Sequence, residues 1–125
     1  MSQPEQGAGG YLTTHILDTS KGTPAAGVGI ELFRLDGHER KLVATAVSNS
    51  DGRTETPLLA ADSFSCGTYE IAFHAGKYLR SSTPGLPEDL FLDVIPVRFG
   101  VNDAASHYHV PLLISPYGYS TYRGS

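Results

Sequence analysis

The sequence has no tryptophan, a single cysteine, and no run of apolar residues longer than a few positions. The one cysteine, Cys66, excludes an intrachain disulfide and a zinc site built from several thiolates. It lies in a turn-like Ser-Cys-Gly-Thr stretch, which favours a plain turn residue over a catalytic nucleophile. The short apolar runs exclude a membrane-spanning helix, and the first ten residues lack the features of a signal peptide. We therefore expect a cytoplasmic protein with no membrane partner.

Positive charge is also scarce. Nine Lys and Arg stand against 13 Asp and Glu, which gives a formal net charge of −4, and no basic run is present. Proteins that bind nucleic acid do so largely by neutralising phosphates with Lys and Arg. The charge balance therefore argues against a nucleic-acid partner.

The chain of 125 residues is long enough for one domain. Its 14 glycines and 8 prolines favour many short elements joined by tight turns. We expect residues 1–10 to be a disordered tail and residues 11–125 to form the domain. A domain of this size is short for an enzyme that must form a deep pocket from its own chain.

Alternating apolar and polar residues between turn signals predict a series of short strands. These strands are expected over residues 11–17, 28–35, 41–47, 67–74, 90–99, 106–115 and 117–123, with 53–56 at most a short edge strand. Residues 75–82 give the one predicted helix, and Pro96 places its strand near a sheet edge. Seven or eight strands without helical alternation predict a mainly β fold, a sandwich or barrel.

Five histidines are the first candidates for chemistry. His38 lies in a turn and His74 ends a strand, so both are expected at the surface. His107 and His109 are two residues apart on one strand and therefore face the same side. With His15 as a third ligand they could bind zinc. Catalysis without a metal, or two half-buried histidines with no chemical role, are the alternatives.

The C-terminus is unusually rich in tyrosine. Four of the seven tyrosines fall within the last 18 residues, and the sequence closes on Tyr122-Arg123-Gly124-Ser125. Chain ends usually fray into small polar tails, so this segment is expected to pack against something. An arginine, a hydroxyl and a terminal carboxylate together can hold a planar polar ligand. The alternative is a surface strand that simply stops.

Several of these segments together resemble the 5-hydroxyisourate hydrolase family, whose members are transthyretin-like. The matching segments are Thr-His-Ile-Leu-Asp at 14–18, Gly-Thr-Pro-Ala at 22–25, Asp-Gly-Arg at 51–53, His-Tyr-His-Val-Pro-Leu-Leu at 107–113, and the closing Ser-Pro-Tyr-Gly-Tyr-Ser-Thr-Tyr-Arg-Gly-Ser at 115–125. The resemblance implies a transthyretin-like β-sandwich of two four-stranded sheets with one short helix. It also implies a homotetramer, a dimer of dimers, with active sites in a channel between the dimers.

The resemblance also implies roles for individual residues. By that similarity the catalytic residues are His15, Arg53, His109 and Ser125. The substrate-binding residues are Arg53, Tyr122, Arg123, Gly124 and Ser125. No metal and no cofactor are implied, and His107 has no assigned role.

The implied reaction is hydrolysis of 5-hydroxyisourate to 2-oxo-4-hydroxy-4-carboxy-5-ureidoimidazoline in urate breakdown. His109 or His15 would take a proton from water, because a neutral imidazole is a base near pH 7. Arg53 would stabilise the developing oxyanion. Three alternatives stay open: a transthyretin-like small-molecule binding protein, a metal-dependent amidohydrolase using His15, His107 and His109, and a structural interaction domain.

Overall fold

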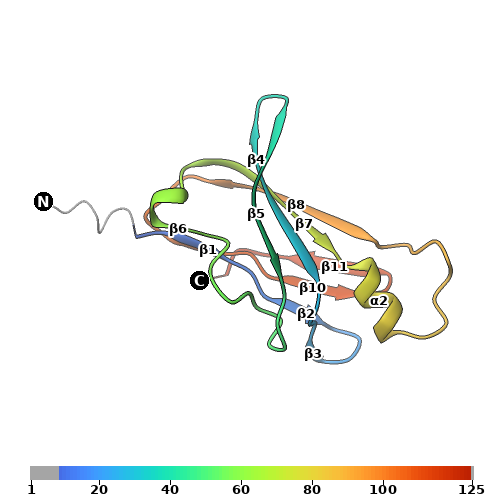
Figure 1. Cartoon of the computed structure of the whole chain (residues 1–125). Helices are drawn as coiled ribbons and strands as arrows, with labels where there is room; N and C mark the ends of the chain where they lie inside the picture. The colour runs from blue at the N-terminus through green and yellow to red at the C-terminus, as the bar shows by residue number, and fades with distance from the viewer. Residues whose placement is uncertain (1–8, 125) are drawn as a thin grey trace, which may run out of the picture.

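The computed structural model describes residues 9–124 and consists of two layers of β-sheet (Figure 1). The first layer is a four-stranded antiparallel sheet in the order β5-β4-β7-β8. Its strands are β4 (Gly29–Asp36), β5 (Glu39–Val47), β7 (Gly67–His74) and β8 (Val94–Val101). The β4–β5 hairpin projects beyond the rest of the domain, as Figure 1 shows.

The second layer is divided into two smaller sheets, in the orders β6-β1-β9 and β11-β10-β2-β3. Its strands are β1 (Tyr11–Thr13), β2 (Ile16–Asp18), β3 (Thr23–Pro24), β6 (Leu59–Ala60), β9 (His107–His109), β10 (Leu112–Ser115) and β11 (Gly118–Thr121). The predicted mainly β, transthyretin-like sandwich is confirmed. The structure differs from the predicted two four-stranded sheets in one detail: the second layer consists of a three-stranded and a four-stranded sheet.

The division arises because two predicted strands are each interrupted once. The segment 11–17 splits at residues 14–15, and 106–115 splits at residues 110–111, where Pro111 has no N–H to donate. The parallel pairing keeps one register across the gap, since Thr13 lies opposite His109 and Ile16 lies opposite Leu112. Backbone hydrogen bonds from the Val110 N–H to the Thr13 carbonyl and from the Leu112 N–H to the His15 carbonyl span the interruption, so the pairing is continuous.

The core lies between the two layers and follows the alternation of the strands. Tyr69, Ile71 and Phe73 of β7 share the inner face and are almost fully buried. They meet Leu12 and Ile16 from the second layer in the same apolar cluster. Burial of side chains of this size stabilises the fold by about 1.5–3 kcal/mol each.

One end of the sandwich carries the helix α2 (Gly76–Ser82), close to the predicted 75–82. A single 3-10 turn, η1 (Ala61–Ser63), follows β6. Pro96 lies on β8, which is an edge strand as predicted. Within residues 9–124, no helix has the length and apolar character needed to cross a membrane.

Gly10, the last residue of the expected tail, is buried, and its carbonyl accepts a hydrogen bond from the Ala61 N–H at 2.9 Å. The ordered domain therefore includes Gly10.

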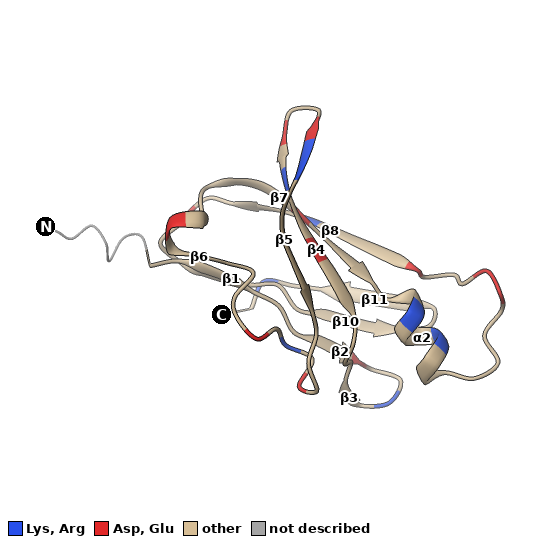
Figure 2. Cartoon of the chain, viewed as in Figure 1, with Lys and Arg blue, Asp and Glu red and all other residues tan. Residues whose placement is uncertain are grey.

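Basic side chains lie at separate places along the chain, including the β4–β5 hairpin and α2 (Figure 2). Cys66 is exposed, in the turn before β7, as its sequence context indicated.

Candidate active site

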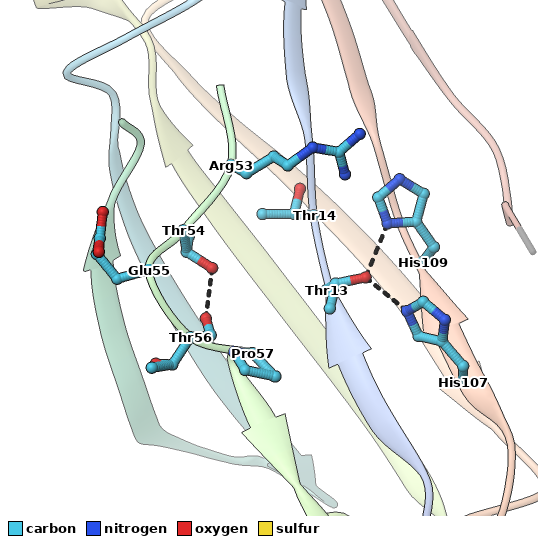
Figure 3. Close-up of a pocket in the computed structure, with 9 residues that line it drawn as sticks. All are labelled: Thr13, Thr14, Arg53, Thr54, Glu55, Thr56, Pro57, His107 and His109. Atoms are coloured by element: carbon cyan, nitrogen blue, oxygen red, sulfur yellow. Dashed lines mark hydrogen bonds between the residues drawn. The ribbon is translucent and has the colours of Figure 1, made fainter. Parts of the chain in front are cut away.

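A polar pocket of about 350 Å³ opens beside the interruption in the second layer. It lies between strands β1 and β9 and the loop that follows β5 (Figure 3). Its lining residues are Thr13, Thr14, Arg53, Thr54, Glu55, Thr56, Pro57, His107 and His109. All of these residues except Pro57 carry a hydroxyl, imidazole, guanidinium or carboxylate group, which suits a small polar ligand better than a purely apolar one.

The predicted placement of His107 and His109 on one side of a strand is confirmed. Both rings turn toward Thr13, which lies on the neighbouring strand β1 (Figure 3). The Thr13 Oγ1 atom is 2.7 Å from His107 Nε2 and 2.8 Å from His109 Nδ1. The His107 ring also stacks on Tyr11, with ring centroids 4.1 Å apart. The two imidazoles are therefore fixed in orientation by one shared hydroxyl.

This geometry bears on the zinc interpretation. The two rings direct Nε2 and Nδ1 to one hydroxyl oxygen at hydrogen-bond distance, where a zinc ion would have to replace that hydroxyl. His15, the third ligand considered, turns its Nε2 to the Asp51 carbonyl at 2.7 Å. Among residues 9–124, no three His, Cys, Asp or Glu side chains are grouped as metal ligands. The arrangement of these histidines fits hydrogen bonding to protein groups.

Arg53 reaches the pocket from a tight turn that is fixed to the second layer. Gly52 has φ +76°, and its carbonyl accepts the Ile16 N–H at 2.8 Å. The side-chain oxygen of Asn49 accepts the N–H groups of Asp51 and Arg53 at 2.9 and 3.2 Å. This Asx-type turn sets the direction in which the arginine leaves the loop.

The segment 53–56, expected to form at most a short edge strand, forms no strand. Its backbone bonds locally, because the Arg53 carbonyl accepts the Asn49 N–H and the Thr54 hydroxyl donates to the Thr56 carbonyl. Within residues 9–124 the Arg53 guanidinium has no hydrogen-bond or ion-pair partner. It extends toward the His109 ring (Figure 3) and presents its charge to the pocket.

The pKa of His109 is shifted at this site. Burial lowers the pKa of His109 below its ordinary value of 6.5, because the charged form loses hydration. The positive charge of Arg53 lowers it further, and so do His107 and His15 in their charged forms. His109 is therefore held in its neutral form at neutral pH, which is the form that can accept a proton.

The C-terminal segment contributes one described residue beside this histidine. The Gly124 N–H donates to the His109 carbonyl at 2.7 Å, and a Cβ at Gly124 would lie 2.7 Å from His109 Cδ2. Only a glycine fits here without moving the ring. Ser125, predicted as a catalytic and binding residue, lies outside the described residues.

Tyr122 and Arg123 are placed differently from the other predicted site residues. Both line a second hollow of about 230 Å³, which is bounded by β8 and the C-terminal segment. The Arg123 guanidinium lies 3.9 Å above the Tyr108 ring, a cation–π contact. The structure thus brings together Arg53, His107 and His109 in one pocket and places Tyr122 and Arg123 on a neighbouring surface.

Comparison with known proteins gives this geometry a context. Residues 12–124 match the model of the HIUase/Transthyretin family. The chain belongs to this family. It is 59% identical over 116 residues to 5-hydroxyisourate hydrolase 2 of Rhizobium meliloti, an alignment that covers 93% of this chain and 97% of the relative.

Solved structures of HIUase/Transthyretin family proteins share the fold. The 5-hydroxyisourate hydrolase of Klebsiella pneumoniae superposes with a TM-score of 0.74 at 36% identity, covering 92% of this chain and 99% of that one. Sea bream transthyretin in complex with thyroxine superposes with a TM-score of 0.79 at 29% identity, covering 90% and 93%. The resemblance to this family drawn from the sequence motifs is confirmed.

Two residues of the pocket's framework escaped the sequence analysis. Thr13 is an ordinary strand residue in the sequence, and its hydroxyl meets His109, 96 residues away along the chain, only in the folded structure. Asn49 could have been found, since an asparagine just before an Asp-Gly turn often caps the turn backbone. The motif search instead drew attention to Arg53, the residue that Asn49 positions.

Proposed function

We propose that this protein hydrolyses 5-hydroxyisourate, the substrate that the relatives' names give. The proposed product is 2-oxo-4-hydroxy-4-carboxy-5-ureidoimidazoline, and the reaction is a step of urate breakdown. The observation that carries the proposal is a neutral histidine, His109, beside the Arg53 guanidinium, which has no partner among residues 9–124, at one polar pocket. A base and an oxyanion stabiliser are the two groups that hydrolysis of a cyclic amide requires. A carrier of apolar ligands would need an apolar lining in their place.

In the proposed reaction, water attacks the C6 carbonyl of the lactam while His109 takes one of its protons. The C6 oxygen becomes an oxyanion, and Arg53 stabilises it by charge and hydrogen bonding. Collapse of this intermediate breaks the C6–N1 bond, and the proton held by His109 passes to N1. Water is thus added across the bond, with no oxidant or cofactor consumed. A positioned base of this kind contributes about 10²–10⁴ in rate.

The structure favours His109 over His15 as the base. His109 lines the pocket and has a lowered pKa, whereas the His15 Nε2 is bonded to the Asp51 carbonyl. We assign His15 to fixing the turn that presents Arg53, and to orienting water or substrate from that side. Both roles belong to the proposal.

The terminal residues have proposed roles that follow from their neighbours. Gly124 packs against the His109 ring, and we assign Ser125 to binding the substrate. We assign Tyr122 and Arg123 to the wall of a site completed by another subunit, because they face away from the pocket of their own chain. This assignment requires the homotetramer that the family resemblance implies.

We place the protein in the cytoplasm as a homotetramer, a dimer of dimers. Two features support the assembly. Strand β11 is a sheet edge with all four residues exposed, and Tyr117, Tyr119 and Tyr122 expose large apolar rings around it. Exposed aromatic side chains beside an open strand edge are typical of interfaces between subunits.

Decay of fresh 5-hydroxyisourate tests the proposed function. The compound is produced from urate with urate oxidase, and its ultraviolet absorbance is followed with and without the protein. We expect faster decay with the protein, and an unchanged rate after EDTA treatment, since only protein groups take part in the proposed chemistry. Decay no faster than the spontaneous reaction would refute the function. Loss of activity with EDTA, restored by Zn²⁺, would instead support the metal-dependent alternative.

A further inference from the structure

The Thr13 hydroxyl stands between two histidines, and its single hydrogen limits how their protons can be arranged. It lies 2.7 Å from His107 Nε2 and 2.8 Å from His109 Nδ1. A hydroxyl has one hydrogen to donate and two lone pairs that accept. Within residues 9–124, its hydrogen has no acceptor other than these two ring nitrogens. It therefore donates to one ring and accepts an N–H from the other.

The position of Arg53 decides which histidine ring donates an N–H to the Thr13 hydroxyl and which ring accepts the hydroxyl hydrogen. The guanidinium lies toward the far edge of the His109 ring, away from Thr13 (Figure 3), and its charge acts on that ring. A positive group disfavours an N–H that points at it and favours a bare nitrogen. The hydrogen of neutral His109 is therefore on Nδ1, where it is donated to Thr13. The Thr13 hydrogen is then donated to His107 Nε2.

We propose that Thr13 is a positioning residue for the hydrolysis: its hydroxyl holds the His109 hydrogen on Nδ1 and leaves Nε2 free to accept the proton of the attacking water. This inference rests on the proposed function. The role parallels that of a group that fixes the tautomer of a catalytic histidine, here with a neutral hydroxyl in place of a carboxylate. His107 takes a role too, as the acceptor that keeps the hydroxyl in this orientation.

Three contacts hold the arrangement rigid. The His107 ring is stacked on Tyr11 at an interplanar angle of 17°, so its Nε2 stays directed at Thr13. The parallel register places Thr13 directly opposite His109. Gly124 packs against the other side of the His109 ring. When Nε2 takes a proton, Nδ1–H and the Thr13 hydroxyl already point the right way, so no dipole has to turn over during the reaction.

The test compares Thr13→Val, which keeps the branched shape and removes the hydroxyl, with Thr13→Ser, which keeps the hydroxyl. We expect kcat to fall about tenfold to a hundredfold in Thr13→Val with KM little changed, the range seen when a histidine loses its orienting partner. Thr13→Ser should restore most of kcat. Circular dichroism, molar mass and melting temperature of both variants verify that the fold is kept.

The second readout is the tautomer itself, measured by long-range ¹H–¹⁵N NMR on histidine-labelled protein, with His109→Gln to assign the signal. Wild type should carry its hydrogen on His109 Nδ1 in neutral solution, and Thr13→Val should gain the Nε2–H form. Wild type with His109 protonated on Nε2 would overturn the inference even if Thr13→Val failed to fold. Full kcat in Thr13→Val, or equal loss in Thr13→Ser, would also overturn it.

These outcomes separate the inference from the proposed function. Wild-type protein that does not accelerate 5-hydroxyisourate decay would refute the function, and the catalytic role of Thr13 with it. Active wild-type protein with an equally active Thr13→Val variant would refute the role of Thr13 alone.

Discussion

His109 is the residue on which the chemistry depends, and its protonation is the property most open to measurement. Burial and the charges of Arg53, His107 and His15 all lower its pKa. A base with a lowered pKa stays neutral further into acid, so activity should persist to lower pH than an ordinary histidine would allow. The acid limb of the rate profile reports this group directly.

We predict that NMR titration of the His109 Cε1 proton gives a midpoint below 6.5. Arg53→Gln should move that midpoint upward, because it removes a positive charge near the ring. Arg98→Gln is the matched control, since Arg98 is paired with Glu70 on the first sheet. A midpoint at or above 6.5 in wild type, or a midpoint that Arg53→Gln leaves unchanged, would contradict the electrostatic description of the site.

Gly124 provides a second prediction at the scale of one residue. The Cβ of Gly124→Ala would lie 2.7 Å from His109 Cδ2, and 3.3 Å from two other atoms of that side chain. The ring or the terminal segment has to move, and a displacement near 1 Å can cost about 10² in rate. We expect kcat/KM to fall at least about tenfold.

Gly118→Ala, in the same terminal segment, is the control for this variant. A Cβ at Gly118 meets only Ser115 Oγ at 3.7 Å, an ordinary contact. We therefore expect that variant to keep its activity. Equal rates in Gly124→Ala and wild type would show that the close approach to His109 has no catalytic consequence.

Much of the residue-level site could be predicted from the sequence, and the exceptions have a physical cause. Residues two apart on a strand share a face, so the common orientation of His107 and His109 follows from local geometry. The hydroxyl between them comes from Thr13, on a strand brought alongside only by the folded pairing. Arg53 was singled out by its motif, whereas its direction depends on hydrogen bonds to Asn49.

At the scale of elements, the same contrast appears in the strands. The alternating pattern predicted β4 and β7 closely, because each lies with one face in a continuous core. The strand predicted at 41–47 corresponds to β5, although its residues are exposed or only partly buried. The interruption at residues 14–15 left no comparable signal, since alternation continues through it, whereas Pro111 marks the matching interruption at 110–111. The pocket lies beside this interruption.

A partly buried hydrogen bond joins helix α2 to the second layer. The Tyr78 hydroxyl donates to Asp18 Oδ2 at 2.6 Å, and Asp18 Oδ1 accepts from Ser20 and Lys21. Burial alone would raise the pKa of Asp18, but these hydrogen bonds together lower it. Burial and the Asp18 carboxylate raise the pKa of Tyr78 to about 12, so the phenol keeps its proton.

We predict that Tyr78→Phe lowers the free energy of unfolding by about 1–3 kcal/mol at pH 7, because it leaves a buried carboxylate oxygen without its donor. Urea unfolding at fixed protein concentration measures this. Tyr117→Phe is the control, since the Tyr117 hydroxyl forms no hydrogen bond within the described part of the chain and its ring is exposed. Equal stabilities of Tyr78→Phe and Tyr117→Phe would contradict the role of this contact.

The same contact has a pH dependence of known sign. The folded pKa of Asp18 lies below its unfolded value. Its stabilisation is therefore present above the unfolded pKa of about 3.9 and is lost as pH falls through the folded value. Tyr78→Phe removes one of the hydrogen bonds that lower the folded pKa, so in the variant the pH-dependent loss should be smaller and should be complete at a higher pH.

At the scale of the whole molecule, the pocket is open and some predicted site residues face elsewhere. A chain of 125 residues can share walls between subunits rather than enclose a substrate alone. We expect light scattering after size exclusion to give about four times the chain mass of 13.3 kDa. A monomer that is fully active would contradict the assignment of Tyr122 and Arg123 to a shared site.

The central claim is that hydrolysis takes place at the pocket of His109 and Arg53. Its most direct test is the rate of 5-hydroxyisourate decay with wild type, His109→Gln and Arg53→Gln at equal concentration and confirmed assembly. We predict that each substitution lowers the protein-dependent rate by about 10² or more. Rates within about twofold of wild type in both variants would contradict the claim, because an active protein would then hydrolyse the substrate without these two side chains.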